Sequence, residues 1–235
     1  ALIYPVFVLA LAVCVVIVLM VKVVPTFMDI FASYDAELPL ITQSLIWVSN
    51  FFQKYILLII VVIAAIVLLF KLYANTEKGR MNVAKLALKL PVLGNVTLLS
   101  AASEFAANLT TLIGAGLQLT RAVSITARVI NNYYISQSVG KMTSRLEEGH
   151  TLGECMREAN CLPDILVDMT AVGEETGELE GTLHTVSGYY ESELDMAVQD
   201  VLKKLEPTLL IFMAVVAGYI VLAVYIAMFQ MYSVM

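Results

Sequence analysis

Charged residues are scarce in this chain of 235 residues. Asp, Glu, Lys and Arg together make up 14% of it, whereas 60% is hydrophobic and the mean hydropathy is +0.83. A soluble domain carries about 25% charged residues. Three runs hold no Asp, Glu, Lys, Arg or His at all: residues 1–21, 55–70 and 207–235. Because roughly 20 apolar residues of helix cross the core of a bilayer, the composition disfavours a soluble domain and predicts a membrane protein.

The uncharged runs predict three transmembrane helices, at residues 1–24, 54–73 and 206–231. The middle run is the shortest, but Lys54 and Lys71 at its ends can reach the two interfaces with their ammonium groups. The first run is too long for a secretory signal peptide and lacks a basic segment before it. Because the chain begins inside this run, we expect further sequence upstream of its first residue.

Basic residues lie on only one side of the second predicted helix. Residues 25–53 hold three acids and no Lys or Arg. The basic residues that follow the helix are Lys71, Lys78, Arg80, Lys85 and Lys89. By the positive-inside rule, residues 25–53 form a short external (periplasmic) loop, and residues 74–205 form a cytoplasmic domain. The loop contains two short amphipathic stretches separated by Pro39, so we expect short helices there.

Residues for common active sites are missing. No G-x-x-x-x-G-K-[ST] phosphate loop is present, so the chain is not expected to hydrolyse nucleotides. The only histidines, His150 and His184, have no partner at a metal-ligand spacing, and Cys14, Cys155 and Cys161 match no zinc or redox motif. The predicted spans carry no acid at mid-depth, which disfavours intramembrane proteases and proton-coupled transporters. A net charge of −6 disfavours nucleic acid as a partner. We therefore expect no catalytic residue, cofactor or metal.

The segment between the second and third predicted spans has the sequence pattern of a helical bundle. Apolar residues recur at helical spacing, and residues that end or begin helices separate these runs. The expected boundaries are Gly114, Gly116, Asn131, Asn132, Gly149, Thr151 and Pro163. Thr151 and Glu154 match the T-x-x-E capping box, and Pro163 suits the first turn of the next helix.

A long helix is predicted after Gly177. Apolar residues alternate at spacings of four and three from Leu179 to Leu205, which predicts a continuous buried stripe. This helix leads directly into the third predicted span through Glu206 and Pro207. We expect Pro207 to cap, kink or restart the helix there.

The stretch AVGEETGELEGTL (residues 171–183) gathers carboxylates among glycines. It lacks the pattern of a calcium loop. Gly177 favours a left-handed turn that ends a helix, and Glu178 and Glu180 would then favour the start of the next helix. Glu174 and Glu178 would repel each other slightly on a shared helix face. A turn between packed helices is the favoured interpretation; a partner-docking corner and a metal or catalytic site stay open.

Several ordered motifs resemble one family. They are "ANLTTLIGAGLQLTRAV" (107–123), "LPDILVDMTAVGEETGELEGTL" (162–183) and "KKLEPTLLIFMAVVAGYIVLAVYIAMFQM" (203–231). With the loop "VPTFMDIF…LPLITQSLIWVS", they are similar to the inner-membrane platform proteins of type II secretion systems and type IV pili (GspF/PilC type). The resemblance covers essentially the whole chain. Family members often carry Pro after the "AVY" of the last span, where this chain has Ile226-Ala227.

The resemblance implies an all-α membrane protein with three transmembrane helices and a cytoplasmic six-helix up-down bundle, without the family's N-terminal cytoplasmic domain. It implies a non-enzymatic platform in the cell inner membrane that couples a cytoplasmic assembly ATPase to insertion of pilin or pseudopilin subunits. Implied partners also include other inner-membrane assembly proteins, the lipid bilayer and further copies of the chain, but no nucleic acid. The candidate partner-binding or mechanical residues are Gly114, Gly116, Leu117, Gly173, Glu174, Glu175, Thr176, Gly177, Leu179, Glu206 and Pro207.

Two other classes stay open from sequence. A transporter or permease subunit would need a polar path between its spans. A membrane enzyme would use the carboxylates of Glu174, Glu175 and Glu178. The acidic bundle itself would complement a basic surface on a motor or a neighbouring subunit. The sequence does not distinguish pilus assembly from secretion or DNA uptake.

Overall fold

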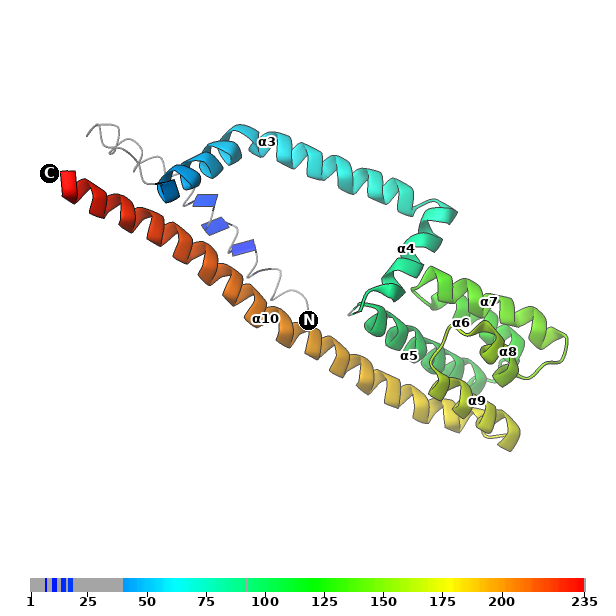
Figure 1. Ribbon diagram of the computed structural model, residues 1–235. Helices are drawn as coiled ribbons and strands as arrows, with labels where there is room; N and C mark the ends of the chain where they lie inside the picture. The colour runs from blue at the N-terminus through cyan, green and yellow to red at the C-terminus, as the bar shows by residue number, and fades with distance from the viewer. Residues whose placement is uncertain are drawn as a thin grey trace. The chain divides into compact units, whose positions relative to one another are not determined.

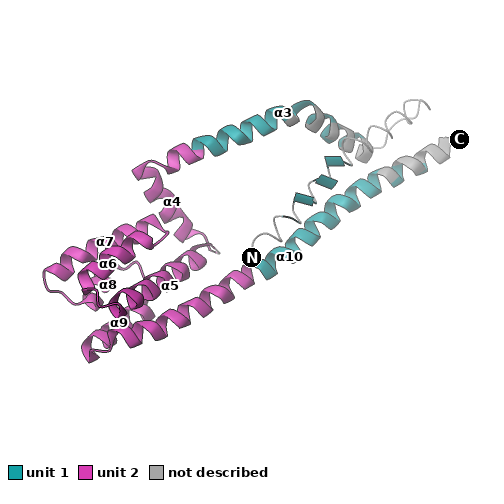
Figure 2. Cartoon of the chain, turned by 180° about the vertical axis from the view of Figure 1, so that it is seen from behind, with its two compact units in different colours: residues 1–69, 202–235 teal, residues 70–201 magenta. Residues whose placement is uncertain are grey.

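The computed structural model describes residues 7, 10, 11, 14, 15, 17 and 18 and the ranges 40–91 and 93–234. The chain divides into two compact units, which Figure 2 shows in different colours. Unit 1 comprises residues 1–69 and 202–235, and unit 2 comprises residues 70–201. The elements of the described ranges, α3 to α10, are all α-helices, which confirms the predicted all-α class.

Three helices in the described part of the chain are long and apolar enough to cross a membrane. Two of these stretches, Leu57–Ala74 in α3 and Leu179–Ala223 in α10, overlap the second and third predicted spans. The third is Leu93–Gly114, which is α5. A larger share of this apolar stretch is buried than of the other two, 28% against 0% and 6%. The reason is that one side of α5 forms part of the core of unit 2. The first predicted span, residues 1–24, lies for the most part outside the described residues.

Helix α3 (Leu40–Ala74) includes part of the predicted external loop. Residues 25–39 lie outside the described part, whereas residues 40–53 are helical and continue without a break into the second predicted span. Trp47, Phe51 and Tyr55, spaced one turn apart, have ring centroids separated by 5.9 and 5.0 Å. The second amphipathic stretch is therefore an extension of α3 rather than a separate helix.

Unit 2 is a bundle of helices around one apolar core (Figure 1). Its helices are α4 (Glu77–Lys89), α5 (Leu93–Gly114), α6 (Leu119–Val129), α7 (Tyr133–Glu147), α8 (Leu152–Ala159), α9 (Asp164–Thr176) and the first part of α10 (Leu179–Val234). The largest fully buried apolar side chains are Phe105, Leu109, Val123, Ile135, Val139, Leu152, Met156, Leu166 and Leu183. Helices α5 to α10 thus share one core.

Helix α4 is not predicted from the sequence, where its residues stand out only as a basic stretch. Its N-cap is Thr76, whose hydroxyl oxygen accepts a hydrogen bond from the N–H of Gly79 at 3.1 Å. Ala84 is buried against the bundle, while the lysines are exposed. Basic residues and Gly79 interrupt the helical spacing of its apolar residues. The stability of this helix therefore depends mainly on its packing against the bundle.

Glycines end α5 and α7 as predicted, with φ of 80° at Gly116 and 93° at Gly149. After α5 the N–H of Gly116 donates to the carbonyl of Ile113 at 2.8 Å, and the N–H of Leu117 donates to that of Leu112 at 3.0 Å. This is the Schellman arrangement, in which a left-handed glycine lets the last carbonyls find partners. Leu117 and Leu112 both pack against the core, so the end of α5 is fixed on both sides.

Helix α10 carries the predicted stripe only in its first part: Leu183, Val186 and Tyr190 are buried in unit 2, whereas the stripe positions from Leu194 to Leu205 are only half-buried. Pro207 neither ends nor restarts α10, which continues through it to Val234. A proline at this position has no N–H to donate to the carbonyl four residues earlier, that of Lys203. The helix is therefore continuous through Pro207 although it has one backbone hydrogen bond fewer.

Candidate functional site

The acidic stretch forms the turn between α9 and α10, as favoured from sequence. Helix α9 ends at Thr176, Gly177 adopts φ 75° and α10 begins at Leu179. The N–H of Thr182 donates to the carbonyl of Glu178 at 3.1 Å, so Glu178 directly precedes the new helix. We call residues Gly173 to Glu180 the α9–α10 corner. Because the turn separates them, Glu174 and Glu178 do not share a helix face.

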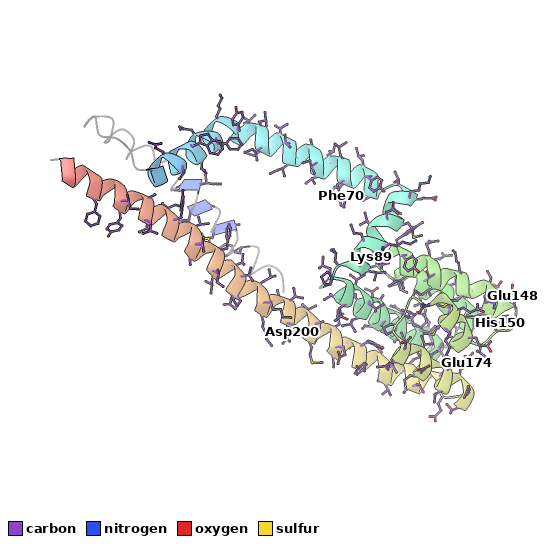
Figure 3. All side chains as sticks on the ribbon, in the orientation of Figure 1. Phe70, Lys89, Glu148, His150, Glu174 and Asp200 are labelled. Atoms are coloured by element: carbon purple, nitrogen blue, oxygen red, sulfur yellow. The ribbon has the colours of Figure 1, made fainter. Side chains whose placement is uncertain are left out.

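The carboxylate of Glu174 binds the N-terminus of another helix, α8. Its Oε1 accepts the N–H of Leu152 at 2.8 Å, and its Oε2 accepts the N–H of Gly153 at 3.0 Å. The first backbone N–H groups of a helix have no partner within it, and a carboxylate there gains charge-assisted hydrogen bonds. Glu174 therefore ties α9 to α8, a role that the sequence analysis did not assign to it. Figure 3 labels Glu174 on α9.

The predicted capping box completes the same helix end. The N–H of Glu154 donates to Oγ1 of Thr151 at 3.2 Å, and the N–H of Thr151 donates to Oε2 of Glu154 at 3.3 Å. With Leu152 and Gly153 bound by Glu174, all four of the otherwise unpaired N–H groups of α8 have partners. The Thr151 N–H is the main cause of a lowered pKa at the Glu154 carboxyl, and His150 adds to it.

Glycines let α9 approach its neighbours on two sides. A Cβ on Gly153 of α8 would lie 2.7 Å from Cβ of Ala171 and 3.1 Å from its Cα. A Cβ on Gly173 would lie 2.9 Å from Cβ of Thr182 and 3.2 Å from Cα of Leu179, both in α10. Carbon atoms in contact normally lie about 3.5–4.0 Å apart. Both positions therefore require glycine, and α9 is held between α8 and α10.

The end of α5 also lies at this corner. A Cβ on Gly114 would lie 2.8 Å from Oε1 of Glu180, in the first turn of α10. The structure thus brings the predicted residues at the end of α5 together with those of the α9–α10 corner. Glu206 and Pro207 lie instead in the part of α10 that belongs to unit 1.

The remaining predicted residues of the corner have different environments. Leu179 is half-buried and packs against the core. Oγ1 of Thr176 donates to the carbonyl of Val172 at 2.8 Å. Glu175 and Glu178 are exposed. Among the described residues no group of three His, Cys, Asp or Glu side chains is placed to hold a metal ion. The chemistry offered by the corner is therefore an exposed negative surface on a closely packed turn.

A second polar network escaped the sequence analysis. Glu104 of α5 accepts the backbone N–H of Asn131 at 3.1 Å and its side-chain amide at 2.6 Å. Asn132 caps α7 by accepting the N–H of Ile135 at 3.1 Å and donates to the carbonyl of Ala84 in α4 at 3.1 Å. From sequence, the Asn-Asn pair predicts only a break between helices. The preference of Asn for N-cap positions was the available signal for half of this network.

Cys155 and Cys161, in and just after α8, are buried. Burial raises the pKa of the Cys155 thiol, and it raises the pKa of Cys161 to about 11. Because the thiolate is the reactive form, both thiols are expected to be inert in the folded protein. They lie in and directly after α8, so they report on unfolding at the site.

The sequence of the chain matches a known protein family and several curated proteins. The model of the family described as "Type II secretion system (T2SS), protein F" matches residues 105–227, slightly more than half of the chain. The type IV pilus assembly protein PilC of Pseudomonas aeruginosa is 34% identical over all 235 residues, which cover 63% of that relative. PilC of Thermus thermophilus is 32% identical over 98% of the chain and 57% of the relative.

The type II secretion system protein F of Aeromonas hydrophila is 29% identical over 95% of the chain and 58% of the relative. The chain thus spans 57% to 63% of the length of these three curated relatives. Similarity to both the pilus and the secretion proteins extends over nearly all of its residues, and the family match includes the α9–α10 corner and most of α10. The chain belongs to the type II secretion system protein F family.

Proposed function

We propose that the chain is the inner-membrane platform of a type IV pilus or type II secretion machine. In this role it binds a cytoplasmic assembly ATPase and couples its motion to insertion of pilin or pseudopilin subunits into a growing filament. Its relatives bear the names of type IV pilus assembly proteins and of type II secretion system protein F, which supports both machines alike. Copies of the chain and other inner-membrane assembly proteins complete the platform.

One observation carries the proposal: a single helix belongs both to the bundle core and to a candidate span. Leu183 and Tyr190 of α10 are buried in unit 2, and the same helix contains the uncharged residues that begin at Pro207. A hydrogen-bonded helix transmits displacement along its axis, since each turn is tied to the next. A force applied to the bundle would therefore reach the membrane-embedded part of α10.

The arrangement of charges supports a cytoplasmic position for residues 74–205. Five basic residues lie between Lys71, in the last turn of α3, and Lys89, at the end of α4, whereas residues 25–53 contain none. Exposed Glu175 and Glu178 would then face the cytoplasm and suit a basic surface on the ATPase. Glu174 is already engaged in capping α8, so it contributes to docking only by holding the corner in shape.

Deleting the gene in its own bacterium tests the platform role. We expect loss of surface pili or loss of secreted proteins from the culture medium, restored by the intact gene. Electron microscopy of cells measures the first outcome and analysis of the medium measures the second, so the experiment also separates the two machines. A deletion strain with normal pili and normal secretion would contradict the proposal.

Replacing Pro207 by alanine tests mechanical coupling through α10. Alanine restores the N–H that can donate to Lys203 and removes a residue that costs about 3 kcal/mol in a helix interior. We expect the variant to insert into the membrane at the normal level but to assemble filaments poorly, since the added hydrogen bond removes the freedom to bend that Pro207 leaves between two otherwise continuous helix segments. Val215→Ala, an exposed change further along α10, is the control. Normal filament assembly by Pro207→Ala would exclude a mechanical role for the junction.

A further inference from the structure

We propose that α4 is an interfacial helix whose lysine face binds a bilayer surface rich in anionic phospholipid. The inference rests on the proposed crossing of the membrane by α3. It adds a lipid-binding surface to unit 2, which α3 and α10 also connect to the proposed spans.

The chain itself keeps α4 near the membrane surface. The apolar stretch of α3 ends at Ala74, and α4 begins at Glu77. A residue extends the chain by at most about 3.6 Å, so α4 starts within roughly 11 Å of the end of the span. Its 13 residues make a helix about 20 Å long. Headgroups are therefore within reach of its first turns in any arrangement of the two units.

Positive charge is concentrated around this helix. Residues 71–103 hold five basic residues and one acid, Glu77, although the whole chain carries a net charge of −6. A juxtamembrane cluster of this kind is attracted to anionic lipids, and the attraction falls off within a Debye length of about 8 Å at physiological salt. Lys71 lies inside the last turn of α3 and is therefore within that distance, and α4 with the other basic residues starts within roughly 11 Å of the end of the span.

The charges form one face of α4. At 100° per residue, Lys78, Lys85 and Lys89 fall within about 40° of one another. Figure 3 labels Lys89 at the end of this helix. The ammonium group of Lys85 lies 5.2 Å from the ring centroid of Tyr134 in α7, which fixes one edge of the face against the bundle. All three lysines are exposed, and no ion pair involving them is found among the described residues.

Exposed leucines lie beside this face. Leu86 is 59% exposed and Leu90 is 41% exposed, and Leu93 at the start of α5 is 54% exposed. The opposite side of α4 packs on the bundle through Ala84 and Leu88. Lysines bordered by apolar side chains, on a helix fixed by its other side, are the pattern of a helix that lies in the headgroup layer.

Lipid contact by α4 can be measured in the reconstituted full chain. An environment-sensitive fluorophore on Leu86→Cys reports contact with lipids that carry a quencher near the headgroup. The background is Cys14→Ser, because Cys155 and Cys161 are buried and unreactive. A second reporter on Ile63→Cys, well inside the apolar stretch of α3, reports insertion of the span through lipids that carry the quencher on the acyl chain. Vesicles contain either phosphatidylcholine alone or phosphatidylcholine with phosphatidylglycerol.

We expect the Leu86 reporter to be quenched in vesicles with phosphatidylglycerol and much less in phosphatidylcholine. Lys78→Gln, Lys85→Gln and Lys89→Gln together should reduce the equilibrium constant for lipid contact roughly a hundredfold. Raising the salt to about 1 M should have a similar effect, since the Debye length falls to about 3 Å. The matched control replaces three exposed basic residues elsewhere in the bundle by glutamine: Arg121, Arg128 and Lys141. It changes net charge equally and should leave the quenching unchanged.

Three results would overturn the inference: quenching of Leu86 that is equal in both vesicles, that survives the three lysine changes, or that is lost equally in the control. Absent quenching at Leu86 with normal quenching at Ile63 would overturn it while leaving the proposed crossing intact. Absent quenching at both sites would refute the crossing of α3 and this inference with it. Slow thiol reaction of Cys155 in every variant verifies that the bundle is folded.

Discussion

Replacing Gly153 by leucine should lower the free energy of unfolding of the bundle by about 3 kcal/mol or more. Even the first added carbon would lie 2.7 Å from Cβ of Ala171 and 3.1 Å from its Cα, and a backbone atom cannot move aside as a flexible side chain can. Helices α8 and α9 would have to separate, which would also lengthen the hydrogen bonds from Leu152 and Gly153 to Glu174. Packing and capping would therefore be lost together.

Gly188→Leu is the matched control for this prediction. Gly188 lies in α10 within unit 2, and no atom lies within 4 Å of an added Cβ. Removing glycine from a helix interior there should stabilise the bundle by up to about 1 kcal/mol. The same substitution thus has opposite signs at two helical glycines.

The rate at which Cys155 and Cys161 react with a maleimide, followed against urea concentration in detergent, measures unfolding of this part of the chain. Both thiols are buried, and they become reactive only when α8 opens. If Gly153→Leu and the unchanged protein have the same urea midpoint for labelling, α8 and α9 can accommodate a side chain between them and the prediction is wrong.

Features set by a few neighbouring residues could be predicted from the sequence. The left-handed turn at Gly177, the glycine ends of α5 and α7 and the capping box of Thr151 and Glu154 all agree with the structure. Each depends on backbone geometry within about one turn, so the residue types alone indicate it. For Pro163 the predicted position differs from the observed one by one residue. It is the N-cap of α9 rather than part of its first turn.

Features that join distant segments could not be predicted. Glu174 and Leu152 are 22 residues apart, and Asn132 reaches Ala84 across 48 residues. Nothing in the sequence near Glu174 indicates that its partner is a helix N-terminus in α8. Helix α4 was missed for a related reason, since only packing on the bundle distinguishes it from a basic linker.

The structure therefore divides the acidic stretch into two kinds of carboxylate. Glu174 is half-buried and bound to two backbone N–H groups, whereas its neighbour Glu175 is exposed. Sequence alone treats these adjacent residues as equivalent members of one cluster. If the α9–α10 corner docks a partner, replacing Glu174 should lower the stability of the bundle, whereas replacing Glu175 should weaken docking.

Glu174→Ala should lower the free energy of unfolding of the bundle by about 2–3 kcal/mol, because two N–H groups of α8 lose a charged acceptor. Glu174→Gln keeps an acceptor oxygen without the charge and should lose about half as much. Glu175→Ala, next to it and exposed, should change stability by no more than about 0.5 kcal/mol. The urea dependence of Cys155 labelling measures all three variants.

Filament assembly then separates structure from docking at the same corner. Glu174→Ala should reduce assembly only in proportion to the bundle that unfolds, so a compensating Gly188→Ala change, which stabilises α10, should partly restore it. Glu175→Ala and Glu178→Ala together should reduce assembly with the bundle intact, and lysine at both positions should reduce it further by repelling a basic partner. Unchanged assembly with both lysines would limit the corner to holding α8, α9 and α10 together. If Glu174→Ala leaves the free energy of unfolding unchanged, the N-terminus of α8 does not need the carboxylate from α9.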